Sequence, residues 1–193
     1  MTDRTRTITE FHAQLAGGPA WQVAGWGSAA LQRARFEALT RAASFRGGSV
    51  LDWGCGPGDL YFHLHDLGLP LVYEGIDLNP RMTALATSRG VPDVTTDDTA
   101  RRDYDYVFAS GIFQFKDQND PVYFVSVLET LYEHSRVACA ANFLTAERAA
   151  QDMAPDELYV DPATVTRVAA ALTDRWTVDH SYHPADLTIA LHH

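Results

Sequence analysis

Hydrophobic positions follow two alternating periods along most of the chain. Short apolar runs with the length of a buried strand are followed by stretches in which apolar residues recur every three or four positions, the spacing of one helix face. The expected strands cover residues 49–53, 71–77, 91–96, 104–109, 136–143, 176–182 and 187–191. The expected helices cover residues 8–15, 29–46, 60–67, 81–88, 121–131 and 162–172. Strands that alternate with helices and end in a β-hairpin predict a three-layer α/β domain with helices on both faces of the sheet.

The chain divides into an N-terminal helical cap, residues 1–48, and a core, residues 49–193, within a single domain. The cap carries Trp26 in a glycine-flanked loop, and Ser28 is placed to cap the helix that follows. Two interpretations of this segment are open. Its helix covers one face of the sheet and does nothing more, or the Trp26 loop closes over a ligand from outside.

The first expected strand runs into a glycine-rich turn, Asp52-Trp53-Gly54-Cys55-Gly56-Pro57-Gly58. A strand, a glycine turn and a helix in this order form the first half of a nucleotide-binding unit, because backbone without Cβ atoms lets a ligand approach the amides. Amides at the start of the next helix favour a carboxylate or phosphate. The dinucleotide fingerprint needs glycines at positions one, three and six, whereas here they stand at one, three and five. A P-loop needs Gly-Lys-Ser/Thr, which is absent.

Acidic residues follow the next two strands. Asp77 comes 19 positions after Gly58, close to the spacing at which a carboxylate accepts hydrogen bonds from ribose hydroxyls. The alternative is that Asp77 only caps the following helix. Asp97 ends the third strand, with Asp98 beside it, and Ser110 follows the fourth. Ligands of open parallel sheets bind outside the carboxyl ends of the strands, so these residues are expected at one crevice.

Composition narrows the class of partner. The net charge is −10, and Lys116 is the single lysine, which argues against a broad phosphate-binding surface and favours a small-molecule substrate over a nucleic acid. No apolar run approaches the roughly 20 residues of a membrane span, and no hydrophobic segment follows the N-terminus, so a cytoplasmic protein is expected. Two cysteines suggest neither a disulfide scaffold nor a metal site.

The string from Val50 to Leu60 resembles motif I of the class I S-adenosylmethionine (SAM)-dependent methyltransferases, and the order of elements from about Trp26 onward is similar to that family. The resemblance implies a Rossmann-like sheet of seven strands in the order 3-2-1-4-5-7-6, with strand 7 antiparallel. It implies SAM as cofactor, S-adenosylhomocysteine (SAH) as product, and no metal. Together with the Trp26 loop, the expected cofactor-binding residues are Trp26, Asp52, Gly54, Cys55, Gly56, Gly58, Asp77, Leu78, Asp97, Ser110 and Gly111.

Within this resemblance, Asp77 matches the acid that binds the ribose and Leu78 the residue that flanks the adenine. Asp97, with Asp98 as its rival, matches the acid near the adenine amino group. Ser110 and Gly111 belong to the motif after the fourth strand, which faces the methionine part of SAM and the reacting centre.

A narrower resemblance covers small bacterial methyltransferases with Trp-Gly-Ser, Gln-x-x-Arg-Phe, Ser-Gly-Ile-Phe and Asn-Phe-Leu motifs, which begin here at Trp26, Gln32, Ser110 and Asn142. The last hairpin departs from it. Such proteins often read Tyr-Leu-Pro-His-Asp-Phe-Thr, whereas residues 182–188 read Tyr-His-Pro-Ala-Asp-Leu-Thr. The histidine has therefore moved by two positions, which leaves the acceptor chemistry open.

Methyl transfer needs orientation and exclusion of water more than covalent catalysis, and it needs a general base only where the acceptor loses a proton. His183 is the candidate base, the alternative being a solvated hairpin histidine. The expected acceptor-binding residues are Phe113, Asn142, Phe143 and Tyr182. The leading interpretation is methyl transfer to oxygen or nitrogen of a small molecule such as a natural product. A protein that binds SAM or SAH without transfer, as sensor or partner subunit, and a non-methylating SAM-binding cyclase are the alternatives.

Overall fold

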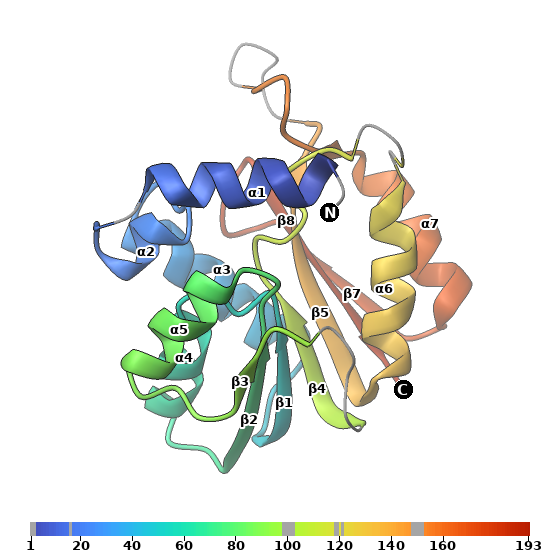
Figure 1. The fold of residues 1–193 in the computed structure, drawn as a ribbon. Helices are drawn as coiled ribbons and strands as arrows, with labels where there is room; N and C mark the ends of the chain where they lie inside the picture. Colours follow the sequence, from blue (N-terminus) through green and yellow to red (C-terminus); the bar gives the residue numbers. More distant parts are fainter. Residues whose placement is uncertain (1–2, 16, 98–102, 118–119, 121, 148–152) are drawn as a thin grey trace.

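One mixed sheet lies between two layers of helices in the computed structural model (Figure 1). The structure describes residues 3–15, 17–97, 103–117, 120, 122–147 and 153–193. The strands are β1 (Gly48–Trp53), β2 (Leu71–Ile76), β3 (Val94–Thr95), β4 (Tyr104–Ala109), β5 (Ser135–Thr145), β6 (Tyr159–Val160), β7 (Trp176–Asp179) and β8 (Asp186–His192). The helices are α1 (Asp3–Gln14), α2 (Ala20–Val23), α3 (Ala29–Ala42), α4 (Asp59–Asp66), α5 (Pro80–Ser88), α6 (Tyr123–Glu133) and α7 (Pro162–Leu172).

The strand order is β3-β2-β1-β4-β5-β8-β7. Strand β8 pairs antiparallel with both β5 and β7, while β3, β2, β1, β4 and β5 are mutually parallel. Because β7 and β8 are the sixth and seventh strands of the expected pattern, the predicted order and the antiparallel strand are confirmed. The difference is β6, an eighth strand of two residues that pairs with the end of β5. A strand this short has no hydrophobic period to detect.

The core consists of two hydrophobic clusters, one on each face of the sheet. Helices α6 and α7 cover large side chains of β4, β5 and β8. On the other face, β5 and β8 present only Ala138, Ala140 and Ala190 to the cluster that contains α3. These small side chains leave room for Phe36 and Leu39 of α3, so the helix packs close to the two strands. This packing carries the start of α3 toward the end of the sheet where β8 begins.

The N-terminal segment lies over the carboxyl ends of the parallel strands, where α1 crosses the top of the molecule in Figure 1. Phe11 of α1 packs edge-on against Phe115, with ring centroids 5.1 Å apart. Ser28 Oγ accepts a hydrogen bond from Leu31 N at 3.2 Å, which confirms the predicted cap of α3. Within the described residues, no helix is long and apolar enough to cross a membrane.

Candidate functional site

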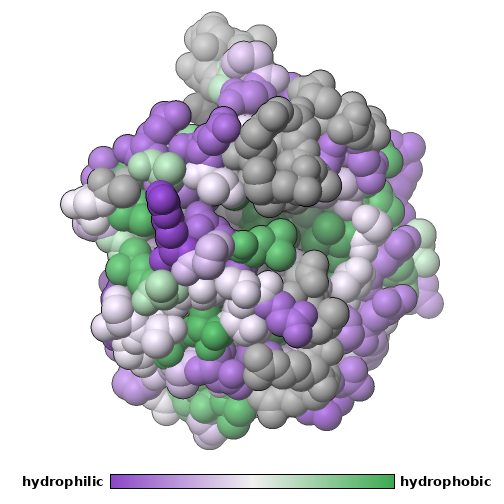
Figure 2. Space-filling view, viewed as in Figure 1, coloured by the Kyte–Doolittle hydropathy of each residue, from purple (hydrophilic) through white to green (hydrophobic). Residues whose placement is uncertain are grey.

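A cavity of about 640 Å³ opens at the carboxyl ends of the parallel strands. Figure 2, in the same view as Figure 1, shows hydrophobic residues in the hollow at the centre of this face. The walls of the cavity come from the glycine turn, the end of β2, the loop after β4, the end of β5, the β7–β8 loop and the N-terminal segment. Of the residues expected at the site, those that line it are Trp26, Asp52, Gly54, Cys55, Gly56, Asp77, Leu78, Ser110, Gly111, Phe113, Asn142, Phe143 and His183.

The three glycines of the turn all have positive φ angles, and an added Cβ would meet different surroundings at Gly56 than at the other two. A Cβ on Gly54 would lie 2.2 Å from Ile112 Cγ2, and one on Gly58 would lie 2.4 Å from Val91 Cγ2. Those two positions are closed by packing. A Cβ on Gly56 would meet nothing nearer than Ala24 Cβ at 4.0 Å, and Gly56 lines the cavity. The backbone at Gly56 is therefore exposed to a ligand, as a close-approach position requires.

Asp77 lies half-buried beside this backbone. Its Oδ2 accepts a hydrogen bond from Gly56 N and its Oδ1 one from Asn79 N, both at 2.8 Å. A carboxylate has about four acceptor positions, so two remain for a ligand. Burial raises the pKa of Asp77, against the hydrogen bonds from Asn79 and Gly56, which lower it. The N-cap of α5 is Asn79, whose Oδ1 accepts from Arg81 N at 3.1 Å, so the cap expected as the alternative role of Asp77 belongs to its neighbour.

Asp52 ends up deeper than Asp77, with 2% of its surface exposed. Its Oδ2 accepts a hydrogen bond from Tyr73 Oη at 2.7 Å. Burial raises the pKa of Asp52 to about 7, with smaller contributions from the charges of Asp77 and Asp59, while the Tyr73 hydrogen bond opposes the rise. Burial also raises the pKa of the neighbouring Cys55 thiol, which keeps it un-ionised and unreactive.

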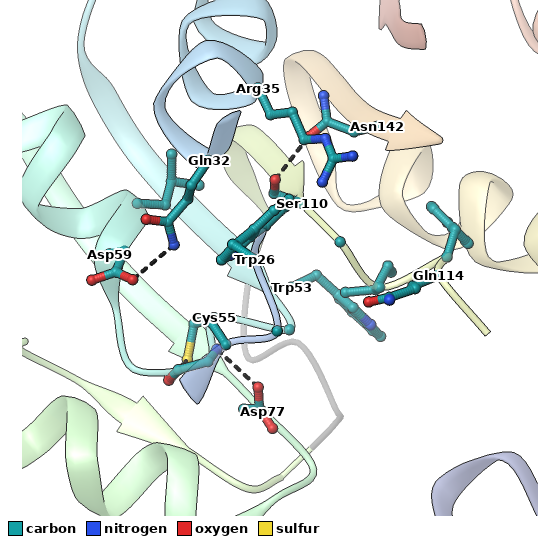
Figure 3. Close-up of a pocket in the computed structure, with 18 of the residues that line it drawn as sticks. Trp26, Gln32, Arg35, Trp53, Cys55, Asp59, Asp77, Ser110, Gln114 and Asn142 are labelled. Atoms are coloured by element: carbon teal, nitrogen blue, oxygen red, sulfur yellow. Dashed lines mark hydrogen bonds between the residues drawn. The ribbon is translucent and has the colours of Figure 1, made fainter. Parts of the chain in front are cut away.

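The Trp26 loop forms the wall opposite the glycine turn. A Cβ added to Gly111 would lie 3.1 Å from Trp26 Cζ2, so the indole packs directly on the loop after β4. The guanidinium Cζ of Arg35 lies 4.6 Å from the Trp26 ring centroid, within the range of a cation–π contact. Figure 3 shows Trp26 between the glycine turn and Arg35, with Ser110 beside it.

Gln32 and Arg35 of α3, for which the sequence predicted no role, also line the cavity. Gln32 Nε2 donates to Asp59 Oδ2 at 2.7 Å, which ties α3 to the helix that follows the glycine turn (Figure 3). Arg35 lies one turn further along the same face. Two signals in the sequence were available: the Gln-x-x-Arg-Phe motif that begins at Gln32, and the i, i+3 spacing of its two polar residues, which places both on one helix face.

Aromatic rings line the part of the cavity after β4 and at the end of β5, where the methyl acceptor is expected. This part is called the acceptor half, and the part beside the glycine turn and Asp77 the cofactor half. Phe113 and Phe143 stack with centroids 4.4 Å apart and planes 12° apart. Asn142 is occupied on both ends of its amide: Oδ1 accepts from Ser110 Oγ at 2.7 Å, and Nδ2 donates to Thr188 Oγ1 at 2.6 Å. These two hydrogen bonds hold the Asn142 side chain in place in the cavity wall.

Three of the expected residues do not line the cavity. Tyr182 lies behind the wall, where its hydroxyl accepts from Thr188 Oγ1 at 3.0 Å and burial raises its pKa to about 12. Gly58 lies at the N-cap of α4. Asp97 is exposed after β3, and Asp98 lies outside the described residues. The acid near the adenine therefore stays a prediction. Within the described part of the chain, no group of three or more His, Cys, Asp or Glu side chains could hold a metal ion.

His183 reaches the cavity from the β7–β8 loop, with 31% of its side chain exposed. Its Nδ1 lies 3.2 Å from Asp186 Oδ2 and 3.2 Å from Ala185 N, which donates to it. Ala185, which stands where the resembling proteins have histidine, lines the same cavity.

Comparison with known proteins places these features in context. No protein-family profile matches the chain. A "putative methyltransferase" of Mycobacterium tuberculosis is 32% identical over 125 residues, which span 61% of this chain and 75% of that protein. The trans-aconitate 2-methyltransferase of the same species is 40% identical over 63 residues, which span 33% of this chain and 24% of that enzyme.

Solved structures share the fold at low sequence identity. The magnesium protoporphyrin IX methyltransferase of Synechocystis PCC 6803, solved with bound SAH, has a TM-score of 0.67 and 12% identity, covering 97% of this chain and 98% of that chain. A SAM-dependent methyltransferase of Archaeoglobus fulgidus has a TM-score of 0.66 and 15% identity, covering 86% of this chain and 95% of that chain.

Proposed function

Because the chain belongs to the class I SAM-dependent methyltransferases, we propose that it binds SAM and transfers the methyl group to oxygen or nitrogen of a small molecule. The observation that carries this proposal is the pairing of Asp77 with Gly56. A half-buried carboxylate that lines the cavity, with two remaining acceptor positions, lies next to backbone that no Cβ shields from the cavity. This arrangement fits a ribose whose two hydroxyls donate to one carboxylate.

The residues of the cofactor half would hold SAM as follows. Asp77 accepts from the ribose hydroxyls, and Leu78, which lines the cavity with 56% of its surface exposed, flanks the adenine. The glycine turn and Gly111 approach the methionine part. Trp26 covers this half from outside and excludes water.

SAM supplies a methyl group already activated by its sulfonium, so the chain contributes orientation, exclusion of water and a place for the acceptor's proton. The stacked Phe113 and Phe143 rings orient the acceptor body against the end of β5. His183 is the group in the acceptor half that can take a proton from a hydroxyl or amine as the bond to carbon forms.

The charges of the cavity favour one class of acceptor. Arg35 is the single guanidinium among the lining residues, and Asp186 occupies it, while the described lining contains no lysine. The acids at the wall include Glu157, whose Oε1 accepts from Gln114 Nε2 at 3.1 Å. A compact acceptor with an apolar or aromatic body and one hydroxyl or amine suits this lining better than a polycarboxylate. We therefore do not expect trans-aconitate to be the acceptor of this protein.

Calorimetry with SAM and SAH tests cofactor binding, and SAH release tests transfer. We expect a micromolar dissociation constant for SAH, about −8 kcal/mol. With phenols, aromatic amines and alkyl amines offered beside trans-aconitate, we expect SAH release above background with members of the first three groups. Absence of SAH binding contradicts the cofactor proposal. SAH binding with trans-aconitate as the best acceptor contradicts the acceptor class.

The proposal also concerns the partner of the protein and its location in the cell. A small-molecule acceptor, not a nucleic acid, is the partner that the acidic chain favours. The cytoplasmic location of the protein stays a prediction.

A further inference from the structure

Arg35, which is half-buried, and Asp186, which is buried, form an ion pair between α3 and the start of β8. Arg35 Nε donates to Asp186 Oδ2 at 2.8 Å, and Nη2 donates to Oδ1, so both carboxylate oxygens are held by one planar guanidinium. The exposed fractions of the two side chains are 17% and 1%. Such a two-point contact fixes the carboxylate in position and in plane. A pair of this kind is not explained by stability, because removing two charges from water costs about as much as their attraction returns.

One side of the pair faces the acceptor half. Asp186 Oδ2, the oxygen that accepts from Arg35 Nε, also lies 3.2 Å from His183 Nδ1. The backbone of Asp186 takes part in the same loop, since its carbonyl oxygen lies 2.7 Å from His180 Nδ1. The His183 ring therefore lies between the Ala185 amide, which donates to Nδ1, and a carboxylate that Arg35 holds. The contact with this carboxylate becomes an ion pair when the imidazole takes a proton.

The other side of the pair faces the cofactor half. The guanidinium of Arg35 lies over the Trp26 ring, and Trp26 packs on Gly111. The face of the Arg35 guanidinium thus contacts Trp26, which covers the cofactor half. Its edge donates to Asp186, which lies beside His183, the candidate base. Figure 3 shows Arg35 beside the Ser110–Asn142 pair, with Trp26 below them.

We propose that Arg35 and Asp186 are positioning residues that connect Trp26 in the cofactor half to His183 in the acceptor half. The inference rests on the proposed function, because it takes Trp26 as the cover of the cofactor. A ligand that moves Trp26 also moves the guanidinium stacked on it, then the carboxylate, then the imidazole. The acceptor base is thereby placed in its working position when the cofactor half is filled.

The chain contains a matched control for this test. Arg41 lies six residues further along α3, and its guanidinium donates to Asp179 on β7 through Nε at 2.9 Å and through Nη2. This second ion pair joins the same helix to the same hairpin, yet neither residue lines the cavity. Arg35→Gln and Arg41→Gln each remove one helix–hairpin ion pair, and only the first lies between the two halves of the site.

The experiment follows the ring signals of His183 by NMR in histidine-labelled protein, with His183→Gln for assignment. Spectra are compared with and without saturating SAH, whose affinity for each variant is first measured by calorimetry. In the wild type and Arg41→Gln we expect SAH to shift the His183 signals. In Arg35→Gln we expect SAH binding within about tenfold of wild type, with the His183 shift lost.

Each other result decides the matter. A wild-type His183 that does not respond to bound SAH, or an Arg35→Gln protein in which the response persists, overturns the connection. Loss of SAH binding in folded Arg35→Gln and Arg35→Lys assigns Arg35 to the cofactor directly and also overturns it. If the wild type itself binds no SAH, it is the proposed function that fails, so the two failures are distinguishable.

Discussion

Asp52→Asn should change the pH dependence of stability in a direction opposite to that of most carboxylates. The Asp52 carboxyl is buried and accepts a hydrogen bond from Tyr73 Oη, a bond that an asparagine oxygen can also accept. Burial raises its pKa from 3.8 to about 7. Between these values the folded chain holds a proton that the unfolded chain has lost, so the folded state loses stability as the pH rises.

The magnitude follows from the two proton affinities. Each tenfold difference corresponds to about 1.4 kcal/mol, so the full range from 3.8 to about 7 corresponds to about 4 kcal/mol. An experiment that begins at pH 5 covers about two thirds of that range. The wild type should therefore lose about 3 kcal/mol in its free energy of unfolding between pH 5 and pH 8 through Asp52, and Asp52→Asn should not.

Urea unfolding at pH 5, 6, 7 and 8, followed by circular dichroism, measures this difference. Asp105→Asn is the control, because hydrogen bonds from Ser49 lower the pKa of Asp105. A lowered acid contributes stability that is lost only as the pH falls below its ordinary value of 3.8, so this variant should keep the wild-type slope between pH 5 and 8. Other titrating groups are common to all three proteins and cancel in the comparison.

Equal slopes for the wild type and Asp52→Asn would refute the reasoning. That result would mean that Asp52 is ionised in the folded chain at pH 5, with its charge compensated inside the glycine turn. The same titration repeated with saturating SAH shows whether the ligand changes the ionisation.

Three further predictions concern the site. Asp77→Ala should weaken SAH binding by about 2 kcal/mol or more, since hydrogen bonds to a charged group contribute roughly 1.5–3 kcal/mol; an unchanged dissociation constant by calorimetry would remove the ribose role. His183→Ala should lower kcat by about 10²-fold with SAH affinity unchanged, and full turnover would leave catalysis to positioning alone. SAH should slow protease cleavage at residues 17–28, because Trp26 covers the cofactor half, and equal cleavage rates would favour a plain surface role for this segment.

The strands and the glycine turn could be predicted because each rests on local signals, whereas the strand order came from the resemblance to the methyltransferase family. Buried parallel strands have continuous apolar runs, and the glycines at 54, 56 and 58 punctuate the chain. The structure adds that the three glycines differ in kind. Only at Gly56 would a Cβ point into open space, whereas at Gly54 and Gly58 it would collide with Ile112 and Val91. A spacing pattern cannot separate ligand approach from tight packing.

The connections across the site could not be predicted, because they join residues far apart in sequence. Arg35 and Asp186 are separated by 151 positions, and their meeting depends on the alanines of β5 and β8 that let α3 approach the sheet. Tyr182 was expected at the acceptor wall from its place in the hairpin. The structure places its hydroxyl against Thr188, one layer behind.

The displaced histidine of the last hairpin still lines the cavity. Residue 185 is an alanine with 5% of its surface exposed and lines the cavity, and His183 lines the same cavity from two residues earlier. A tight loop turns back between them, since Ala185 N donates to His183 Nδ1. Both positions therefore line the same cavity, and both lie beside Asp186. The element that this change of histidine position leaves in place is the Asp186 carboxylate, which Arg35 holds and which lies 3.2 Å from His183 Nδ1.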